Sequence, residues 1–307
     1  MRTRRKTEGR RMMGKANVLL CLGLGFSARR IVELLDPVEW HVIGTATSSA
    51  GLARLSSLGI EGLAFDGSAA ASELAAALKR ATHLLVSAPP GADGDPLLRC
   101  HRADIVAAPS LSWIGYLSTI GVYGDRHGGW VDETDAAAPT STRSRQRAEA
   151  ERAWLALRAE TAARVVLFRL AGIYGPGRSA IDSVLDGRAR RIVKPGQMFN
   201  RIHVDDIAQA VLASMAGHGT ADILNVTDDE PAPPQDVIAH AARLLGCPLP
   251  PEVPYDSADL SPMARSFYAE SKRVRNDLLK RDLGLTLRHP TYREGLAAIA
   301  AAASRGT

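Results

Sequence analysis

Cysteine is scarce in this 307-residue chain, and the three that occur, Cys21, Cys100 and Cys247, stand far apart. An odd number without metal-ligand spacing argues against a disulfide framework and a metal site, and favours reduced thiols in the cytoplasm. No apolar run approaches the ~18–20 residues of a membrane-spanning helix. The sequence therefore predicts a cytoplasmic protein that does not span a membrane.

Excess charge is absent from most of the chain, although the formal net charge is +5. Residues 1–15 contain seven basic residues and one acid, so this segment carries +6 and the remainder sums to −1. Nothing in that remainder resembles a basic stripe for nucleic acid. We expect residues 1–15 to form a disordered basic leader. The alternatives are a secretion signal continuing into residues 18–26, and a basic arm for an anionic partner. We reject the signal because those residues are needed for a strand and a turn.

Short apolar runs alternate with helical stretches rich in Ala, Leu and Arg through the first half of the chain. The expected strands are residues 17–23, 40–47, 61–67, 83–91, 113–119 and 163–172, and the first helices are 27–35, 51–59 and 71–81. Strands separated by such helices are typical of parallel pairing with right-handed crossovers. The sequence thus predicts an α/β fold built on a doubly wound parallel sheet of the Rossmann type.

The pattern changes after Gly175, where proline-rich pieces interrupt it and helices dominate. We expect a Rossmann domain over residues 16–174, to which residues 202–228 return. A smaller substrate-binding region would comprise residues 175–201 and 229–307. One continuous domain is the alternative.

A glycine turn, GLGFSA at residues 23–28, follows the first expected strand and opens a helix. Gly23 permits a tight turn, Gly25 lets the backbone approach a diphosphate at the helix N-terminus, and Ala28 is small enough for helix–strand packing. Its place at the first strand–helix junction predicts a dinucleotide-binding site, with a plain tight turn as the alternative.

An acid is missing at the end of the second expected strand, where NAD-binding proteins hold the ribose diol. The stretch GTATSS offers the hydroxyls of Thr45, Thr47 and Ser48 instead, and Arg29 or Arg54 could add charge. This composition favours NADP and leaves NAD open.

Four later segments resemble the extended short-chain dehydrogenases/reductases, the NAD-dependent epimerase/dehydratase family. They are YLSTIGVYG at 116–124, FRLAGIYGPG at 168–177, RIHVDDIAQAV at 201–211 and DILNVTDDEP at 222–231. With the glycine turn and SAPP at 87–90, the resemblance extends from residue 16 to about residue 296. It is strongest to the atypical branch described as NAD(P)-dependent oxidoreductases.

The resemblance implies site residues, a small-molecule substrate, no nucleic acid partner and, since the family often dimerises through a helix pair, a homodimer. The implied cofactor-binding residues are Gly23, Gly25, Phe26 and Ser27 for the diphosphate, Asp66 for the adenine, and Ser87 and Ala88 for the adenosine ribose. Thr119 would lie beside the nicotinamide and the substrate carbonyl. For Asp66, a turn-forming role before Gly67 is the alternative.

The helix expected around PTSTRSRQRAEAE, residues 139–151, contains neither tyrosine nor lysine. In the family, a tyrosine and a lysine four residues later supply the proton that accompanies hydride transfer. The family's spacing from Thr119 places Arg143 and Arg147 at those positions, with Glu151 matching a family glutamate. A guanidinium is effectively never deprotonated, so Arg143 cannot replace the tyrosine. Arg147 could hold a ribose and Arg143 an anion, with a solvated Arg/Glu helix face as the alternative.

The proton would then come from another side chain. Tyr123 ranks first because it is the nearest phenol by motif, followed by Tyr174, Lys194 and Lys272. Lys272 falls within ESKRVRNDLL, which otherwise predicts a basic amphipathic helix.

Three functions remain open. The first is an NAD(P)-dependent oxidoreductase or epimerase with a non-standard proton donor, acting on a small substrate whose charge could be negative. The second is a non-catalytic NADP(H)-binding sensor or scaffold. The third is an extracytoplasmic or nucleic-acid-associated protein whose function depends on the basic leader, residues 1–15.

Overall fold

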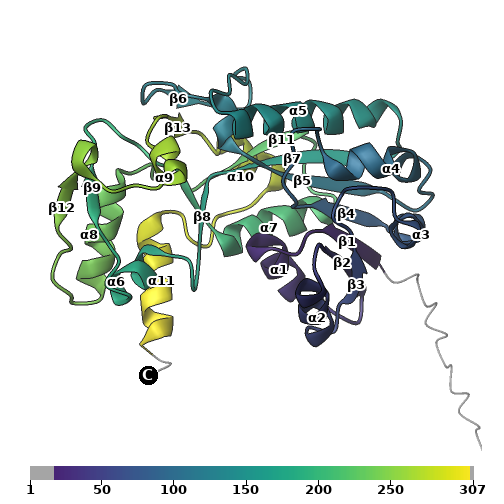
Figure 1. The fold of residues 1–307 in the computed structure, drawn as a ribbon, viewed down its shortest axis with the longest axis horizontal. Coiled ribbons are helices and arrows are strands. Elements are labelled where there is room, and N and C mark those ends of the chain that lie inside the picture. The colour runs from purple at the N-terminus through teal and green to yellow at the C-terminus, as the bar shows by residue number, and fades with distance from the viewer. Residues whose placement is uncertain (1–16, 305–307) are drawn as a thin grey trace, which may run out of the picture.

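Seven strands form one parallel sheet in the order β11-β7-β5-β4-β1-β2-β3 (Figure 1). The computed structural model describes residues 17–304, so the expected leader lies outside the described residues. The strands are β1 (Asn17–Leu22), β2 (Trp40–Ala46), β3 (Glu61–Ala64), β4 (His83–Val86), β5 (Trp113–Thr119), β7 (Arg164–Leu170) and β11 (Ile223–Val226). Every residue of β4 is buried, as expected for a parallel sheet covered on both faces. The predicted doubly wound α/β fold is confirmed.

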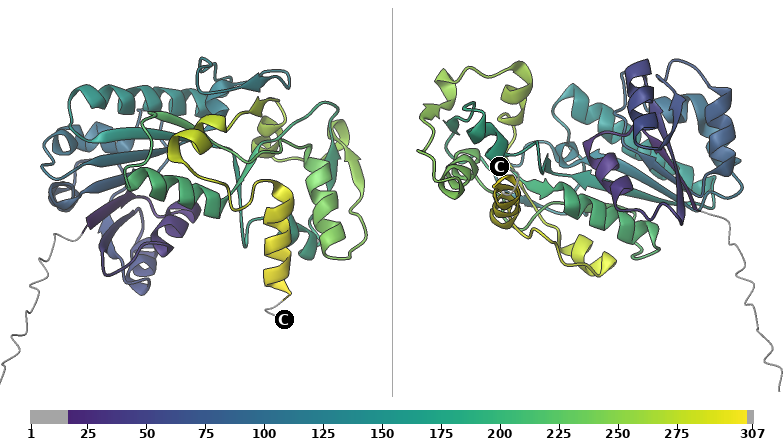
Figure 2. Two further views of the ribbon diagram at one scale, coloured as in Figure 1. Left: turned by 180° about the vertical axis from the view of Figure 1, so that it is seen from behind. Right: turned by 90° about the horizontal axis from the view of Figure 1, so that it is seen from below.

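Helices cover both faces of this sheet (Figures 1 and 2). One face carries α3 (Ser72–Arg80), α4 (Pro96–Val106) and α5 (Thr142–Ala156), and the other carries α1 (Phe26–Glu33) and α7 (Val204–Met215). Helix α2 (Ser49–Ser57) lies beside β2 and β3, and the short helices η1 (Ile120–Tyr123) and η2 (Leu157–Ala159) follow β5 and α5. Trp154 of α5 and Ile207 of α7 are fully buried in the two resulting cores.

A second group of elements lies beyond the carboxyl edge of the sheet (Figure 1). Helices α6 (Ala180–Leu185), α8 (Pro234–Leu244) and α11 (Tyr292–Ala303) share a small core of their own. Two parallel pairs connect this group, β8 (Gly172–Tyr174) with β10 (Arg201–His203), and β9 (Arg191–Val193) with β12 (Glu252–Pro254). The short helices η3 (Tyr255–Ser257) and α9 (Pro262–Phe267) complete it.

The segment ESKRVRNDLL is not one helix, contrary to the expectation. It forms β13 (Arg273–Val274), which pairs with β6 (Trp130–Val131), and α10 (Asp277–Leu283) starts only afterwards. Asn200 explains the difference, because its side-chain amide donates to Lys272 O and accepts from Val274 N, which holds the backbone extended. Leucines of α10 join the core beneath α7, so this part of the expected substrate region packs on the Rossmann sheet. Within residues 17–304, no helix has the length and apolar character needed to cross a bilayer.

Candidate dinucleotide and substrate site

The glycine turn after β1 is fixed from two neighbouring strands. Gly23 has φ +77°, and a Cβ there would meet Ser87 Oγ at 3.3 Å. Its N–H donates to Thr45 Oγ1 at 2.9 Å, and its carbonyl accepts from Ser87 Oγ at 2.9 Å. Residues from β2 and from the end of β4 therefore hold the turn in one conformation, which glycine adopts without strain.

The N-terminus of α1 faces open space. Gly25 is the N-cap of this helix, and no side chain accepts a hydrogen bond from the first turn. A Cβ built on Gly25 would meet nothing within 4 Å. Free helix N–H groups beside an open cradle are the arrangement that binds a diphosphate, so the residues present fit the dinucleotide that the fold implies.

A first cavity of ≈ 570 Å³ extends from this turn along the carboxyl ends of β2 and β3. It brings together the predicted residues Gly23, Gly25, Thr45, Thr47, Asp66, Ser87 and Ala88, and also Arg29 and Arg54. Thr45 is buried and its hydroxyl accepts from Gly23, while the Ser48 hydroxyl caps α2. The hydroxyl of Thr47 and the two guanidinium groups are thus the groups available for a ribose or its 2′-phosphate.

Asp66 lies at the far end of this cavity, directly after β3. Its carboxylate accepts from Ser68 N at 2.8 Å, and this hydrogen bond holds the pKa of Asp66 below its usual value. The side chain therefore stays ionised, and it forms the turn and lines the cavity at the same time.

A second cavity of ≈ 1170 Å³ continues on the other side of the turn. Gly25 and Ser87 line both cavities, which therefore form one crevice across the carboxyl edge of the sheet. The predicted residues that line the second cavity are Phe26, Ser27, Thr119, Arg143 and Arg147. Its opposite wall comes from the C-terminal group of elements.

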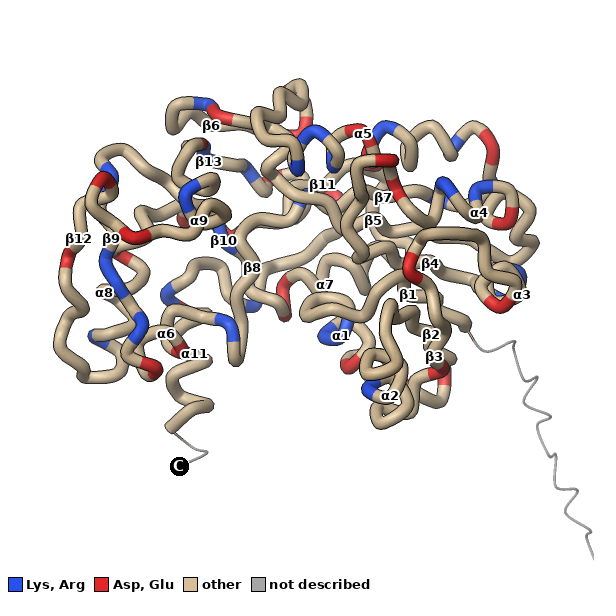
Figure 3. Tube along the Cα trace, in the orientation of Figure 1, with Lys and Arg blue, Asp and Glu red and all other residues tan. Residues whose placement is uncertain are grey.

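Positive charge dominates this second cavity. Its cationic lining residues are Arg143, Arg147, Arg178, Arg188, Arg190, Arg201 and Lys272, against the carboxylates Asp182 and Glu270. Basic positions lie along α5 and around β9 and α6 (Figure 3). Of these seven cations, Arg188 and Lys272 have a carboxylate within 4.0 Å in residues 17–304. The other five form no such ion pair in the described part of the chain, so the lining carries an excess of positive charge that favours an anionic ligand.

Thr119 ends β5 and lines the second cavity. Its Oγ1 accepts from Gly121 N at 3.1 Å as the cap of η1, which leaves the hydroxyl proton free to be donated.

The two arginines on α5 differ in their availability. Arg147 Nη1 donates to Tyr116 Oη and to Leu117 O, both at 3.0 Å, so this guanidinium is bonded to the wall of the sheet. Arg143 is exposed, and its Cζ lies 6.0 Å from the centre of the Phe267 ring. Arg143 is therefore the one of the pair that can turn to an anion.

The prediction that Tyr123 donates the proton is not supported by its position. Its side chain is fully buried and lines neither cavity. The hydroxyl donates to Asn225 Oδ1 at 2.8 Å and accepts from Arg169 Nη1 at 2.9 Å, and burial raises its pKa. Tyr123 thus belongs to the buried packing around η1 and does not reach either cavity, which excludes it as a proton donor there.

The three other candidates are also separated by the structure. Tyr174 lines the second cavity, but its hydroxyl is directed to Thr291 O at 3.4 Å and burial raises its pKa. Lys194 lies outside both cavities and donates to Tyr268 O. Lys272 lines the second cavity.

A buried ion pair supports the site from beneath. Glu151 of α5 and Arg169 of β7 are 3% and 5% exposed. Arg169 Nη2 lies 2.7 Å from Glu151 Oε2, and Nε donates to the same carboxylate. Ser118, the neighbour of Thr119, donates to Glu151 as well. In the sequence, Glu151 stood out only because it matches a glutamate of the family, and nothing there indicated that it would pair with Arg169.

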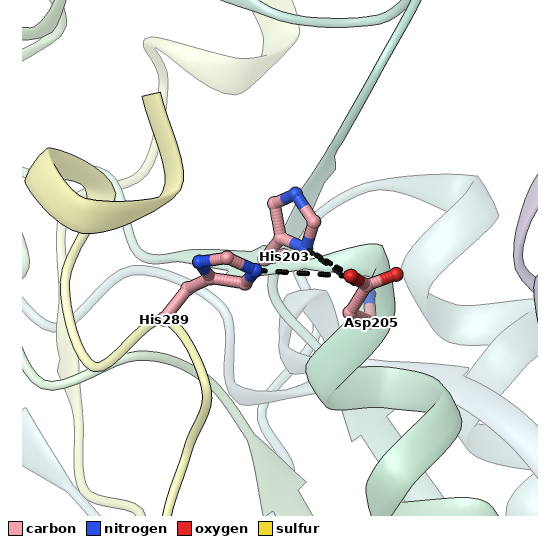
Figure 4. Close-up of side chains that lie close together, drawn as sticks. All are labelled: His203, Asp205 and His289. Atoms are coloured by element: carbon pink, nitrogen blue, oxygen red, sulfur yellow. Dashed lines mark hydrogen bonds and ion pairs between the residues drawn. The ribbon is translucent and has the colours of Figure 1, made fainter. Parts of the chain in front are cut away.

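His203, Asp205 and His289 form a cluster between α7 and the segment before α11 (Figure 4). Their potential ligand atoms lie within 4.8 Å of one another, the one such group among residues 17–304. However, Arg30 Nε lies 2.6 Å from Asp205 Oδ1, and His203 Nδ1 accepts from Asp205 N at 3.1 Å. A guanidinium on the carboxylate and an occupied imidazole lone pair fit a structural ion-pair junction better than a metal site.

This cluster predicts a pH-dependent stability. Burial, together with His289 and Arg30, lowers the pKa of His203, although Asp205 opposes the shift. Below pH ~6.5, His203 is protonated in the unfolded chain but stays neutral in the folded protein. The free energy of unfolding therefore falls as the pH falls. Relative to His203→Asn, whose amide oxygen can still cap α7, the unaltered protein should lose about 1–2 kcal/mol between pH 7 and pH 5. Urea unfolding at each pH measures this difference, and a difference that does not change with pH would contradict it.

Several cavity residues were not foreseen. Arg178 directly follows the YGPG segment and Arg201 opens RIHVDD, yet periodicity does not show which arginines face a cavity. Nothing in the sequence marked Glu270 as a cavity residue except its position two residues before Lys272.

Comparisons with known proteins agree with this geometry. Residues 106–227 match the model of the NAD dependent epimerase/dehydratase family. A functionally unknown conserved protein from Silicibacter pomeroyi, whose structure is solved, is 48% identical over 94% of this chain and 99% of its own, with a TM-score of 0.83. The 3-diazoavenalumate denitrifying reductase of a Streptomyces species is 33% identical over 142 residues. The match covers 43% of this chain and 45% of the reductase, so the chain spans less than half of that relative.

A more distant structure shows the shared fold. UDP-glucuronic acid 4-epimerase from Bacillus cereus in complex with NAD is 17% identical over 94% of this chain and 99% of its own, with a TM-score of 0.70. The family model includes β5, β7, β11 and much of the lining of the second cavity, whereas the glycine turn and the first cavity lie outside it. Taken together, residues 106–227 match the NAD-dependent epimerase/dehydratase family, and the fold and the glycine turn of the rest of the described chain agree with that match.

Proposed function

We propose that the chain binds a nicotinamide dinucleotide along the crevice and transfers hydride between it and a small anionic carbonyl or hydroxyl substrate. The observation that carries this proposal is the meeting of the two cavities at Gly25 and Ser87, over the free N-terminus of α1. One cavity suits the adenosine end of a dinucleotide, and the other leaves room for the nicotinamide and a substrate. The NAD complex of the Bacillus cereus epimerase, which shares the fold, is in keeping with it.

Each part of the crevice has a distinct task in this proposal. The amides of Phe26 and Ser27 hold the diphosphate at the start of α1, and Asp66 meets the adenine. Thr47 and Arg54, in a cavity without an acid at the end of β2, favour a 2′-phosphate and hence NADP over NAD. When bound, the cofactor supplies or accepts the hydride.

Substrate orientation falls to the second cavity. The Thr119 hydroxyl donates to the carbonyl oxygen and polarises it, while Arg143 or another unpaired arginine binds a carboxylate or phosphate of the substrate. The name of the Streptomyces relative describes a reductase whose substrate is a carboxylate, which agrees with an anionic substrate here. Holding the reacting carbon against the nicotinamide is the main contribution of such contacts.

The experiment that tests this function follows NADPH absorbance with a panel of aldehydes, keto acids and nucleotide sugars. We expect turnover on an anionic carbonyl compound, and Thr119→Val should lower kcat by about 100-fold because it removes a donor to the developing oxyanion. The variant should keep the cofactor-induced rise in melting temperature. Binding of NADPH without turnover on any member of the panel would favour the alternative, a non-catalytic NADP(H) sensor.

A further inference from the structure

We propose that Lys272, paired with Glu270, is the proton donor of this site and takes the part that the family gives to a tyrosine on α5. This inference rests on the proposed hydride transfer. Both residues lie between α9 and β13, far in sequence from α5, and both line the second cavity with Thr119 and Arg143.

The backbone of Lys272 is anchored at the carboxyl edge of the sheet. Asn200 Nδ2 donates to Lys272 O at 3.0 Å, and Asn200 O accepts from Gly172 N at 3.0 Å. Gly172 stands two residues after the end of β7, and β7 is the neighbour of β5, which ends in Thr119. The lysine is therefore mounted on a fixed part of the wall that surrounds the expected reaction centre.

The same segment touches the start of α5. Glu270 accepts a hydrogen bond from Thr140 Oγ1, and Thr140 directly precedes Ser141, the N-cap of α5. Two residues further on, Arg143 lies over the ring of Phe267. The Glu270–Lys272 pair thus faces the helix end where the family's tyrosine would stand.

The ammonium group of Lys272 is largely buried, but not all of its N–H groups donate a hydrogen bond. The side chain of Lys272 is 8% exposed, and its Nζ lies 2.6 Å from Glu270 Oε2. An ammonium has three N–H groups, and within residues 17–304 no second partner of Nζ occurs. Two donors therefore remain for a substrate oxygen in the cavity.

The phenols near the cavity are poorer sources of a proton. Tyr268 lines the cavity, but it packs against the rings of Phe199 and Tyr255, and burial raises its pKa. A neutral phenol also lacks the positive charge that stabilises an alkoxide as it forms. Lys272 supplies both the proton and the charge.

The proposed step balances as follows for reduction of a carbonyl compound. Hydride from the reduced nicotinamide dinucleotide forms the new C–H bond, and the C=O π electrons move to oxygen. That oxygen takes a proton from Lys272 Nζ, so an N–H bond breaks as the O–H bond forms. The products are the alcohol and the oxidised dinucleotide, and the lysine amine regains a proton from solvent beside the Glu270 carboxylate.

The test replaces Lys272 by methionine and by arginine and measures kcat with NADPH and the carbonyl compound that the unaltered protein turns over fastest. We expect both variants to lose at least about 100-fold in kcat, because arginine keeps the charge but cannot give up a proton. The NADPH-induced melting shift should stay, which shows that the variants fold. Lys280→Met, at a half-buried lysine that pairs with Asp229 and lines neither cavity, is the matched control and should keep full activity.

A second variant separates a chemical from a structural role. Glu270→Gln removes the carboxylate that holds the ammonium group at 2.6 Å, so kcat should fall by at least about 10-fold while the KM for NADPH stays unchanged. A Lys272→Arg variant with kcat within about threefold of the unaltered protein, or a Glu270→Gln variant with unchanged kcat, would overturn the role of Lys272 and leave the proposed function standing. Failure of the unaltered protein to bind NADPH, or to turn over any carbonyl compound, overturns the proposed function and this inference with it.

Discussion

Replacing Glu151 with alanine should lower the free energy of unfolding by about 3–5 kcal/mol, because it leaves a buried guanidinium without its carboxylate. Arg169 donates through Nε and Nη2 to Glu151, and its remaining Nη1 donates to Tyr123 Oη. Neither member of the pair can reach solvent without moving α5 away from β7. Equilibrium unfolding in urea, followed by circular dichroism, measures the loss.

Glu149 provides the control for this prediction, since it lies on the same helix and is exposed. Glu149→Ala should change the free energy of unfolding by no more than about 0.5 kcal/mol. A loss below about 1 kcal/mol in Glu151→Ala would mean that the ion pair is hydrated and that α5 is positioned by other contacts.

Replacing Gly25 with leucine should abolish dinucleotide binding while the fold persists. The backbone there has φ −78° and ψ −167°, which any residue adopts, and a Cβ would meet no atom within 4 Å. The side chain would therefore fill the space that the diphosphate needs without straining the protein. We expect binding of NADPH to weaken at least about 100-fold, equivalent to about 2.7 kcal/mol. The free energy of unfolding should change by no more than about 1 kcal/mol, the scale of a helix-cap effect.

Gly91 is the matched control for this substitution. Its φ is not positive, a Cβ would again meet nothing within 4 Å, and it lines neither cavity. Gly91→Leu should bind NADPH as the unaltered protein does. Equal binding by Gly25→Leu, measured by calorimetry on both variants, would show that the diphosphate does not lie over α1.

The sheet and the glycine turn could be predicted because their signals are local. Continuous apolar runs mark buried parallel strands, and the turn needs glycine at a fixed place after β1. The same locality explains the failures. The motif placed Tyr123 near Thr119, but its hydroxyl turns to Asn225, about a hundred residues away in sequence, and packing decides that direction.

Long-range contacts also determine the conformation of the C-terminal segment ESKRVRNDLL. ESKRVRNDLL has helical periodicity, yet two hydrogen bonds with the Asn200 side chain, one donated and one accepted, hold its first half extended. Those bonds bring Lys272 to the cavity wall and so create the pair with Glu270. The arginines of the cavity could not be chosen from the sequence either, because arginine is abundant throughout the chain and its spacing does not reveal which side chains converge.

The central claim is that the amides at the start of α1 hold the diphosphate of a nicotinamide dinucleotide. Isothermal titration calorimetry of the purified protein with NADPH and with NADH, combined with melting curves, tests it most directly. The account predicts saturable heat for one site per chain, tighter binding of NADPH than of NADH, and a rise in melting temperature that follows RT ln(1 + [L]/Kd). Absence of heat and of any melting shift with folded protein at millimolar concentrations of both cofactors would contradict it.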